Sequence, residues 1–128
     1  MPAFLGPFSY DEIPSENKIK NLKLSQVELD FSSPLGTYNL GEILQQNTIV
    51  NKIVVRIEIA FNDQPILTIG NTISPEIWMD SVYLDLSIEG MYLVECYDFV
   101  NSTTQAKVYW NPKGTTKGKL KVYLVTSS

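Results

Sequence analysis

The stretch Val54–Gly70, VVRIEIAFNDQPILTIG, decides the fold class of this chain. Over residues 53–60, every second residue is a branched aliphatic one: Ile53, Val55, Ile57 and Ile59. The residues between them are of mixed character. Successive side chains of a β-strand point to opposite faces, so this alternation predicts a strand with one face in a core. The polar run NDQP at 62–65 favours a turn, and the apolar run at 66–69 predicts a second strand. We therefore expect a β-hairpin here.

Other short segments along the chain have the same strand character and are separated by turn residues. They are residues 25–32, 48–61, 82–86, 91–100, 106–110 and 119–126. Residues 38–44 fit a strand or a short helix, and we expect the strand. Ser74 and Pro75 have the usual arrangement of a helical N-cap and first helical residue, so a helical turn is expected there, with Ile77 and Trp78 covering one end of the core.

Seven or eight short strands without an extended amphipathic helix predict an all-β protein. The fold class expected is an antiparallel β-sandwich of two packed sheets. Jelly-roll and immunoglobulin-like topologies both fit this order of strands, and the pattern does not separate them.

The length and the position of the prolines predict how the chain is divided. A chain of 128 residues suits a single domain, and a domain of this size buries roughly two thirds of its unfolded surface. We expect an irregular N-terminal arm over residues 1–14 and one β-sandwich domain over residues 15–128. The arm is interrupted by three prolines, yet it carries large apolar side chains, Phe4, Leu5, Phe8 and Tyr10. These four are the candidate partner-binding residues. The alternatives are an arm folded over its own domain, a disordered tail and a cloning remnant.

Net charge and residue usage exclude several classes of function. The net charge of −4 and a pI near 4.7 do not suit a nucleic-acid-binding protein, which usually carries a basic stripe. The chain has no histidine and one cysteine, Cys96, so a Ser-His-Asp site, a Cys-His site and an internal disulfide are excluded within one chain. The single cysteine fits folding in a reducing cytoplasm. No run approaches the ~20 apolar residues of a membrane helix, and the N-terminus does not resemble a signal peptide.

Carboxylates and aromatic residues provide the remaining candidate sites. A calcium site would draw on Asp80, Asp85, Glu95 and Asp98, but the spacing of an EF-hand is absent, and solvated carboxylates are expected instead. The same holds for a catalytic carboxylate pair, whose candidates by residue type alone are Glu58, Glu76, Glu89 and Glu95. A sugar-stacking platform would use Tyr97, Tyr109 and Trp110, although core positions are the commoner role for such residues. We expect no catalytic residue, no metal and no cofactor.

Three further features have structural interpretations. Tyr92 follows a turn at Gly90, and its hydroxyl is expected to bond back to the preceding loop, as in a tyrosine corner. Cys96 is expected to be a small buried apolar residue. A local basic patch, formed by Lys113, Lys117, Lys119 and Lys121, is expected to be a solvated loop that also guards an edge strand. A contact with an acidic neighbouring subunit is its functional alternative.

A set of short motifs runs from about Leu40 to the C-terminus. It includes a long strand ending in Ala60-Phe61-Asn62, then Pro65–Gly70, Ser74–Met79, Leu84-Asp85-Leu86, Gly90-Met91-Tyr92 and a lysine-flanked strand after Gly118. In these motifs the sequence resembles the small β-sandwich proteins found among the structural proteins of tailed-bacteriophage particles. The resemblance implies a decoration, fibre-base or tail-accessory subunit, often trimeric, without catalytic residues. The N-terminal arm lies outside it.

The function expected is therefore that of a non-enzymatic virion structural protein, made in the host cytoplasm. Its partners would be further copies of itself, with a trimer as one form, and other capsid or tail proteins of the phage. Nucleic acid and membrane are not expected as partners. The main alternative is a glycan- or receptor-binding β-sandwich module, suggested by Trp78, Trp110 and the tyrosines. A small hydrolase is the third hypothesis, and it has no catalytic constellation to support it.

Overall fold

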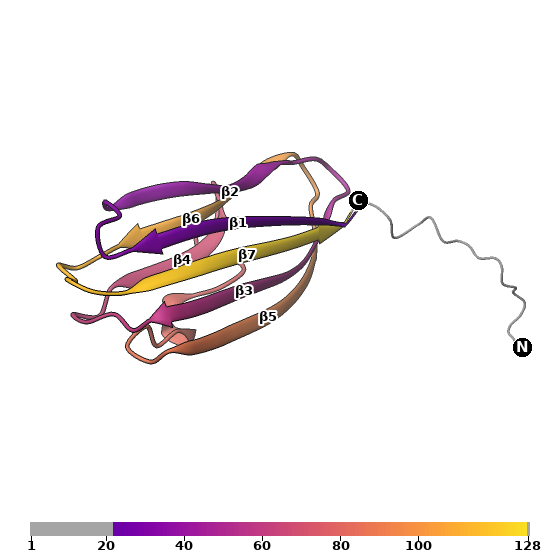
Figure 1. The fold of residues 1–128 in the computed structure, drawn as a ribbon. Helices are drawn as coiled ribbons and strands as arrows, with labels where there is room; N and C mark the ends of the chain where they lie inside the picture. The colour runs from indigo at the N-terminus through magenta and orange to yellow at the C-terminus, as the bar shows by residue number, and fades with distance from the viewer. Residues whose placement is uncertain (1–21, 128) are drawn as a thin grey trace, which may run out of the picture.

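Seven β-strands form two antiparallel sheets that pack face to face in the computed structural model, which describes residues 22–127 (Figure 1). One sheet has four strands in the order β1-β7-β3-β5, and the other has three in the order β2-β6-β4. The strands are β1 Lys23–Asp30, β2 Gly36–Leu44, β3 Ile49–Ile59, β4 Ile66–Asn71, β5 Gly90–Phe99, β6 Thr104–Asn111 and β7 Lys119–Ser127. The prediction of an all-β antiparallel sandwich is confirmed, and residues 38–44 form a strand.

The predicted β-hairpin is wrong, because β3 and β4 belong to different sheets. β3 is an inner strand and pairs with β5 on one side and β7 on the other, so neither of its edges is free for β4. Residues 62–65 carry the chain across the sandwich, and Asp63 and Gln64 turn it with φ angles of 61° and 51°. The Asn62 side chain ties this crossover to the β6–β7 loop by accepting from Thr115 Oγ1 and from the Thr116 backbone N–H, at 2.6 and 2.8 Å.

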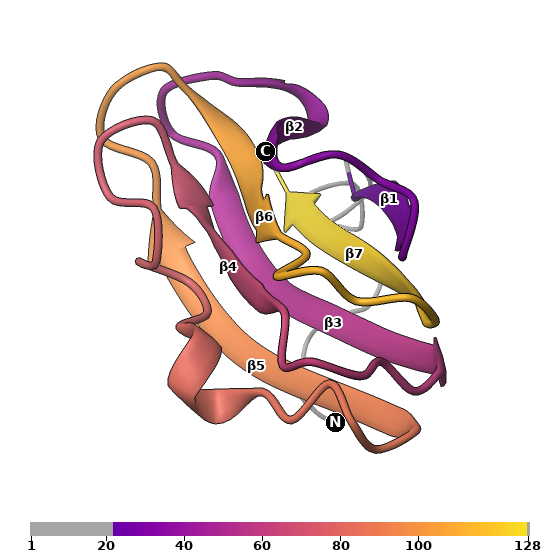
Figure 2. The same cartoon turned by 90° about the vertical axis from the view of Figure 1, so that its left-hand side faces the viewer.

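The topology is that of a jelly roll with one strand replaced by a loop. Every strand is followed in sequence by a strand of the other sheet, and no two consecutive strands pair. An immunoglobulin-like sandwich would pair several consecutive strands, so that alternative is excluded. The eighth strand of a jelly roll would follow β4, and residues 72–89 take its place (Figure 2).

Residues 72–89 contain a single hydrogen-bonded turn at the site of the predicted helical turn of 74–79, where the Ile77 N–H donates to the Ser74 carbonyl at 3.3 Å, but no helix follows from it. The predicted strand of 82–86 is absent from this segment. Met79 forms an isolated bridge with Ile69 of β4. Met79 thereby lies at the outer edge of β4. A short 3-10 helix, η2 Ser81–Tyr83, follows, and the Asp80 carboxylate caps it by accepting from the Val82 N–H at 3.3 Å. The segment 82–86 begins inside this 3-10 helix and pairs with no described strand, so its alternation does not produce a strand.

Two side chains fasten this loop to β5. Trp78 is buried, and its indole N–H donates to the Asp98 carboxylate at 2.8 Å, whereas Ile77 is half exposed. The Tyr92 hydroxyl accepts from the backbone N–H of Asp85 at 3.1 Å and donates to the Asp85 carbonyl at 3.3 Å. The predicted bond from Tyr92 to the preceding loop is confirmed.

The core lies between the sheets and is built from the inward rows of the strands. On β7 the inward row is Leu120, Val122 and Leu124, as predicted from the alternation. β3 departs from strict alternation at two register shifts against β7, one between Val50 and Lys52 and one between Ile57 and Ile59. The second shift turns Ile59 outward, where it is 49% exposed, so the prediction that it belongs to the inward row is wrong. Within residues 22–127, no helix has the length and hydropathy that crossing a membrane requires.

Candidate interaction surfaces

The four residues predicted to bind a partner, Phe4, Leu5, Phe8 and Tyr10, lie outside the described residues. Their role stays a prediction, as does the boundary of the arm at residue 14. The described domain offers three other places for a ligand or a partner: the aromatic and acidic side chains singled out in the sequence, a pocket at one corner of the sandwich, and the edge strand β5.

The tryptophans are core residues and cannot stack on a sugar. Trp78 and Trp110 are 5% and 3% exposed. The Trp110 indole N–H donates to the Ser33 carbonyl at 3.1 Å, and its ring meets Phe61 edge-on with 5.4 Å between centroids. Tyr109 is only partly exposed, and its hydroxyl donates to the Asn71 carbonyl at 2.7 Å. Of the proposed platform, only Tyr97 is exposed, so the three residues do not form one stacking surface, and the glycan-binding alternative loses its two tryptophans.

The acidic residues do not converge into a site. Among residues 22–127, no group of three or more histidine, cysteine, aspartate or glutamate residues is placed to hold a metal ion. Asp98 bonds to Trp78. Asp85 accepts from the hydroxyl and the backbone N–H of Ser87, and these two bonds lower the pKa of the Asp85 carboxyl. Cys96 is half-buried, and burial together with the charge of Asp98 raises the pKa of its thiol to about 11. The thiol is therefore protonated at neutral pH and is a poor nucleophile.

Two of the four predicted patch lysines lie on an inner strand and not at an edge. β7 runs between β1 and β3, so Lys119 and Lys121 guard no edge. Lys119 pairs with Glu28 at 3.0 Å, and this bond raises the pKa of the Lys119 ammonium; both lysines also approach Glu58, at 3.8 and 3.6 Å. These ion pairs lie on the outer surface of the sheet and are solvent-accessible, so each contributes little to the stability of the domain.

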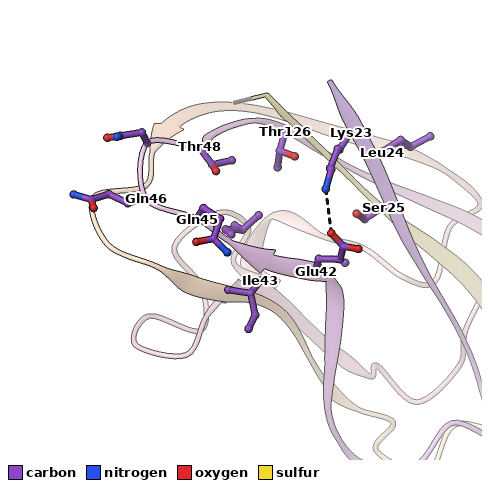
Figure 3. A pocket seen from close by; sticks show the side chains of 12 residues that line it. Lys23, Leu24, Ser25, Glu42, Ile43, Gln45, Gln46, Thr48 and Thr126 are labelled. Atoms are coloured by element: carbon purple, nitrogen blue, oxygen red, sulfur yellow. Dashed lines mark hydrogen bonds and ion pairs between the residues drawn. The ribbon is translucent and has the colours of Figure 1, made fainter. Parts of the chain in front are cut away.

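A pocket of about 610 Å³ opens at the corner where β1 begins and β2 ends. Figure 3 shows an ion pair beside it that joins the two sheets, Lys23 Nζ to Glu42 Oε1 at 3.0 Å. The remaining lining is aliphatic or an uncharged amide or hydroxyl, apart from the backbone of Gly41: Leu24, Ser25, Ile43, Leu44, Gln45, Gln46, Asn47, Thr48 and Thr126. Such a lining suits a ligand held by apolar contacts and neutral hydrogen bonds. Its only charged side chains are those of the exposed ion pair Lys23–Glu42, and it contains no arrangement typical of a catalytic site.

β5 presents an apolar row on the outer face of the four-stranded sheet. Every second residue points outward, and four of these five are large and apolar: Met91, Leu93, Tyr97 and Phe99 are 65%, 56%, 66% and 50% exposed. The fifth is Glu95. This apolar row is present in the sequence, because both alternating rows of residues 91–99 are mostly apolar. The prediction of a strand there did not include an exposed apolar surface. Exposed apolar residues gathered in this way on a monomer are typical of an interaction site.

β5 is also an edge strand, and within residues 22–127 it pairs only with β3. Apart from a weak contact of the Cys96 thiol with the Val94 carbonyl at 3.8 Å, the backbone of β5 bonds only to β3 among the described residues. Two adjoining hollows of about 330 and 440 Å³ lie beside β5, and Ile77, Trp78 and Val94 line both. Their lining residues come from β5 and from the loop that replaces the eighth strand.

The stretch of sequence that contains β5 is acidic, although Arg56 and Lys52 of β3 lie in register with Met91 and Glu95. Between Arg56 and Lys107 the sequence contains no lysine or arginine and eight acidic residues, Glu58, Asp63, Glu76, Asp80, Asp85, Glu89, Glu95 and Asp98. Lys52 of β3 is paired in register with Glu95. On its other side Glu95 has no strand neighbour in the described domain, and it forms no ion pair there.

Comparison with solved structures finds the same fold in phage capsids. A chain in the cyanophage Pam1 capsid asymmetric unit matches with a TM-score of 0.66 and 15% identity over 99% of both chains. A chain in the acidic stable capsid structure of Helicobacter pylori bacteriophage KHP30 matches with a TM-score of 0.67 and 13% identity, over 86% of this chain and 90% of that one. A chain in the capsid of Ralstonia phage GP4 matches with a TM-score of 0.58 and 12% identity, over 91% and 90%. At these identities the likeness establishes the fold.

No family model matches the sequence, and no curated protein matches it.

Proposed function

We propose that this chain is a non-enzymatic structural protein of a tailed-phage virion, where it serves as a decoration subunit of the capsid and associates with copies of itself. The observation that carries the proposal is the match to the Pam1 capsid chain over 99% of both chains. Because coverage is nearly complete on both sides, the two chains have almost the same length. The likeness therefore extends over nearly the whole of that capsid chain.

The surfaces of the domain support an assembly role. The β5 row and the outer face of the four-stranded sheet provide apolar area bordered by charged residues, which is the composition of a protein–protein interface. The described residues contain no cluster suited to catalysis, and the only cysteine is a poor nucleophile. The three matching structures are all phage capsids, which favours a capsid position with other capsid proteins as partners over a fibre-base or tail position.

The proposal is tested on purified particles. Antibodies raised against the recombinant chain should label intact virions, and mass spectrometry should find the chain in a fixed ratio to the main shell protein. Light scattering after size exclusion should show a defined oligomer of the purified chain. A strictly monomeric protein that is absent from particles and does not bind them would refute the proposal.

The arm provides a second test of the same function. Deleting residues 1–14 removes Phe4, Leu5, Phe8 and Tyr10 but leaves the described domain intact, because β1 begins only at Lys23. We expect a folded domain with an unchanged β-type circular-dichroism spectrum and weakened assembly. A full-length variant with the four residues replaced by serine is the matched control for chain length. Unchanged assembly of both variants would show that these side chains bind no partner.

A further inference from the structure

The free edge of β5 is built to accept another strand. An edge strand directs every second N–H and C=O away from its sheet, and these groups attract an added strand unless the edge is blocked. Natural edges are commonly blocked by lysine, proline or a covering segment. β5 has ten residues, no lysine and no proline, and Figure 1 shows it as the outermost strand of its sheet. Its two flanking hollows leave room beside it for the side chains of such a strand.

Charge determines which kind of strand fits. Two copies of β5 pairing with each other would bring together two regions that each carry eight acidic residues and no basic one over residues 57–106. Such like charges disfavour the contact. A strand with basic and apolar residues in alternation would complement this edge, because its lysines would approach Glu95 and its apolar side chains would enter the hollows.

This chain contains such a segment just ahead of β1. Residues Asn17–Leu22 read NKIKNL, in which Lys18, Lys20 and Leu22 alternate with Ile19 and Asn21. We propose that residues Asn17–Leu22 of one copy add as a strand to the free edge of β5 in a second copy. The proposal rests on the proposed function in that it identifies the contact through which copies of the capsid subunit associate. Ile19 enters the hollows beside Val94, and Lys18 and Lys20 lie on the outer face near Glu95.

The geometry favours a second copy over the same chain. β1 and β5 are opposite edges of the four-stranded sheet, three strand spacings apart, or roughly 14 Å. Leu22 directly precedes β1, and the six residues of the segment span at most about 20 Å when extended. Within one chain, residues 17–22 would span most of their length in crossing from β1 to β5, and too few of them would remain to pair along β5. Donation between copies is a head-to-tail contact, which generates a closed ring when the rotation between copies permits.

Cross-linking between two differently tagged copies tests whether the strand added to β5 comes from a second copy or from the same chain. One copy carries Leu22→Cys and the other Leu93→Cys, both with Cys96→Ala, and a short flexible bis-maleimide is added to their mixture. We expect a cross-linked dimer that carries both tags. Replacing the second variant by Leu35→Cys is the control, since Leu35 is 67% exposed but lies in the β1–β2 connection, away from β5. No mixed dimer, or an equal yield with the control, would overturn the proposal. So would a cross-link that forms only when both cysteines are in one chain.

A charge swap tests the chemistry of the contact. Full-length Lys18→Glu/Lys20→Glu should raise the dissociation constant of self-association at least tenfold in sedimentation velocity, and adding Glu95→Lys should recover part of the loss. Lys113→Glu/Lys117→Glu changes the net charge equally and should leave self-association unchanged. An equal loss in both double variants would overturn the proposal. If the chain is monomeric at every concentration yet present in purified particles, this inference and the self-association in the proposed function both fail, and the role as a virion structural protein stands.

Discussion

Single residues hold the two sheets of this sandwich together at the crossover from β3 to β4. Phe61 is 2% exposed and packs edge-on against Trp110, while Asn62 next to it bonds to Thr115 and Thr116 of the β6–β7 loop. The loop can approach this closely because its last residue, Gly118, has no side chain. A Cβ at Gly118 would lie 2.3 Å from the Phe61 ring, and the residue has a φ of +131°.

Gly118→Ala should therefore destabilise the domain by about 3 kcal/mol, which combines overpacking of the core with backbone strain. Gly114→Ala in the same loop is the matched control. Gly114 also has a positive φ, +76°, but a Cβ there would meet nothing within 4 Å, so we expect a loss of only about 1 kcal/mol. Urea unfolding followed by circular dichroism measures both. Equal losses would mean that the contact with Phe61 relaxes without cost.

At the scale of elements, the loop of residues 72–89 replaces a strand and still covers the core. Its attachment depends on Trp78, which is buried and bonds to Asp98 of β5, and on the bridge between Met79 and Ile69 of β4. The loop thereby occupies the free edge of β4 and leaves the free edge of β5 open. One edge of the sandwich is closed by this segment, and the neighbouring edge remains available to a partner.

Trp78→Ala should lower the free energy of unfolding by about 4 kcal/mol, because it creates a cavity and leaves the Asp98 carboxylate without its donor. Ile77→Ala, one residue earlier and 50% exposed, should cost less than about 1 kcal/mol. Hydrogen exchange should show that the Ile69 and Met79 amides, which bond across this bridge, lose protection in the first variant and keep it in the second. Retained protection in Trp78→Ala would show that the loop is held by other contacts.

At the scale of the molecule, the jelly-roll order makes every strand pairing non-local. No strand pairs with its neighbour in sequence, so each pairing requires the closure of a long loop before any stabilising contact forms. The same order places β1 and β5 at the two opposite edges of one sheet. A segment next to β1 of one copy can therefore reach β5 of another copy in the proposed head-to-tail contact.

The domain should consequently fold slowly, in milliseconds to seconds, as all-β proteins of high contact order do. Stopped-flow dilution from urea, followed by tryptophan fluorescence, measures the rate, since both tryptophans become buried. A double-jump experiment separates out phases that arise from proline isomerisation. Folding of the full amplitude within microseconds would contradict this expectation.

Several elements were predictable because their signals are local. The alternation on β7 and β3 and the turn residues between strands identified most strands and their inward rows, and Gly90 with Tyr92 identified the bond to the loop. Ile59 was misassigned because a β-bulge depends on the partner strand. Residues 82–86 were misassigned because alternation alone reveals neither the 3-10 helix at Ser81–Tyr83 nor which segments pair. The apolar outer row of β5 was present in the sequence, but its exposure depends on β5 being an edge strand.

The amino-acid sequence alone determined the β-class, the position of most strands, the acidic character of the chain and the lack of histidine chemistry, because these follow from composition and from the two-residue period of a strand. Only the tertiary structure decided which strands pair, that β3 and β4 cross between sheets, that the tryptophans are core residues, and that β5 has an open edge within the described domain. Strand pairing depends on backbone hydrogen bonds between residues far apart in the chain, and such bonds are not encoded in the alternation of any single segment.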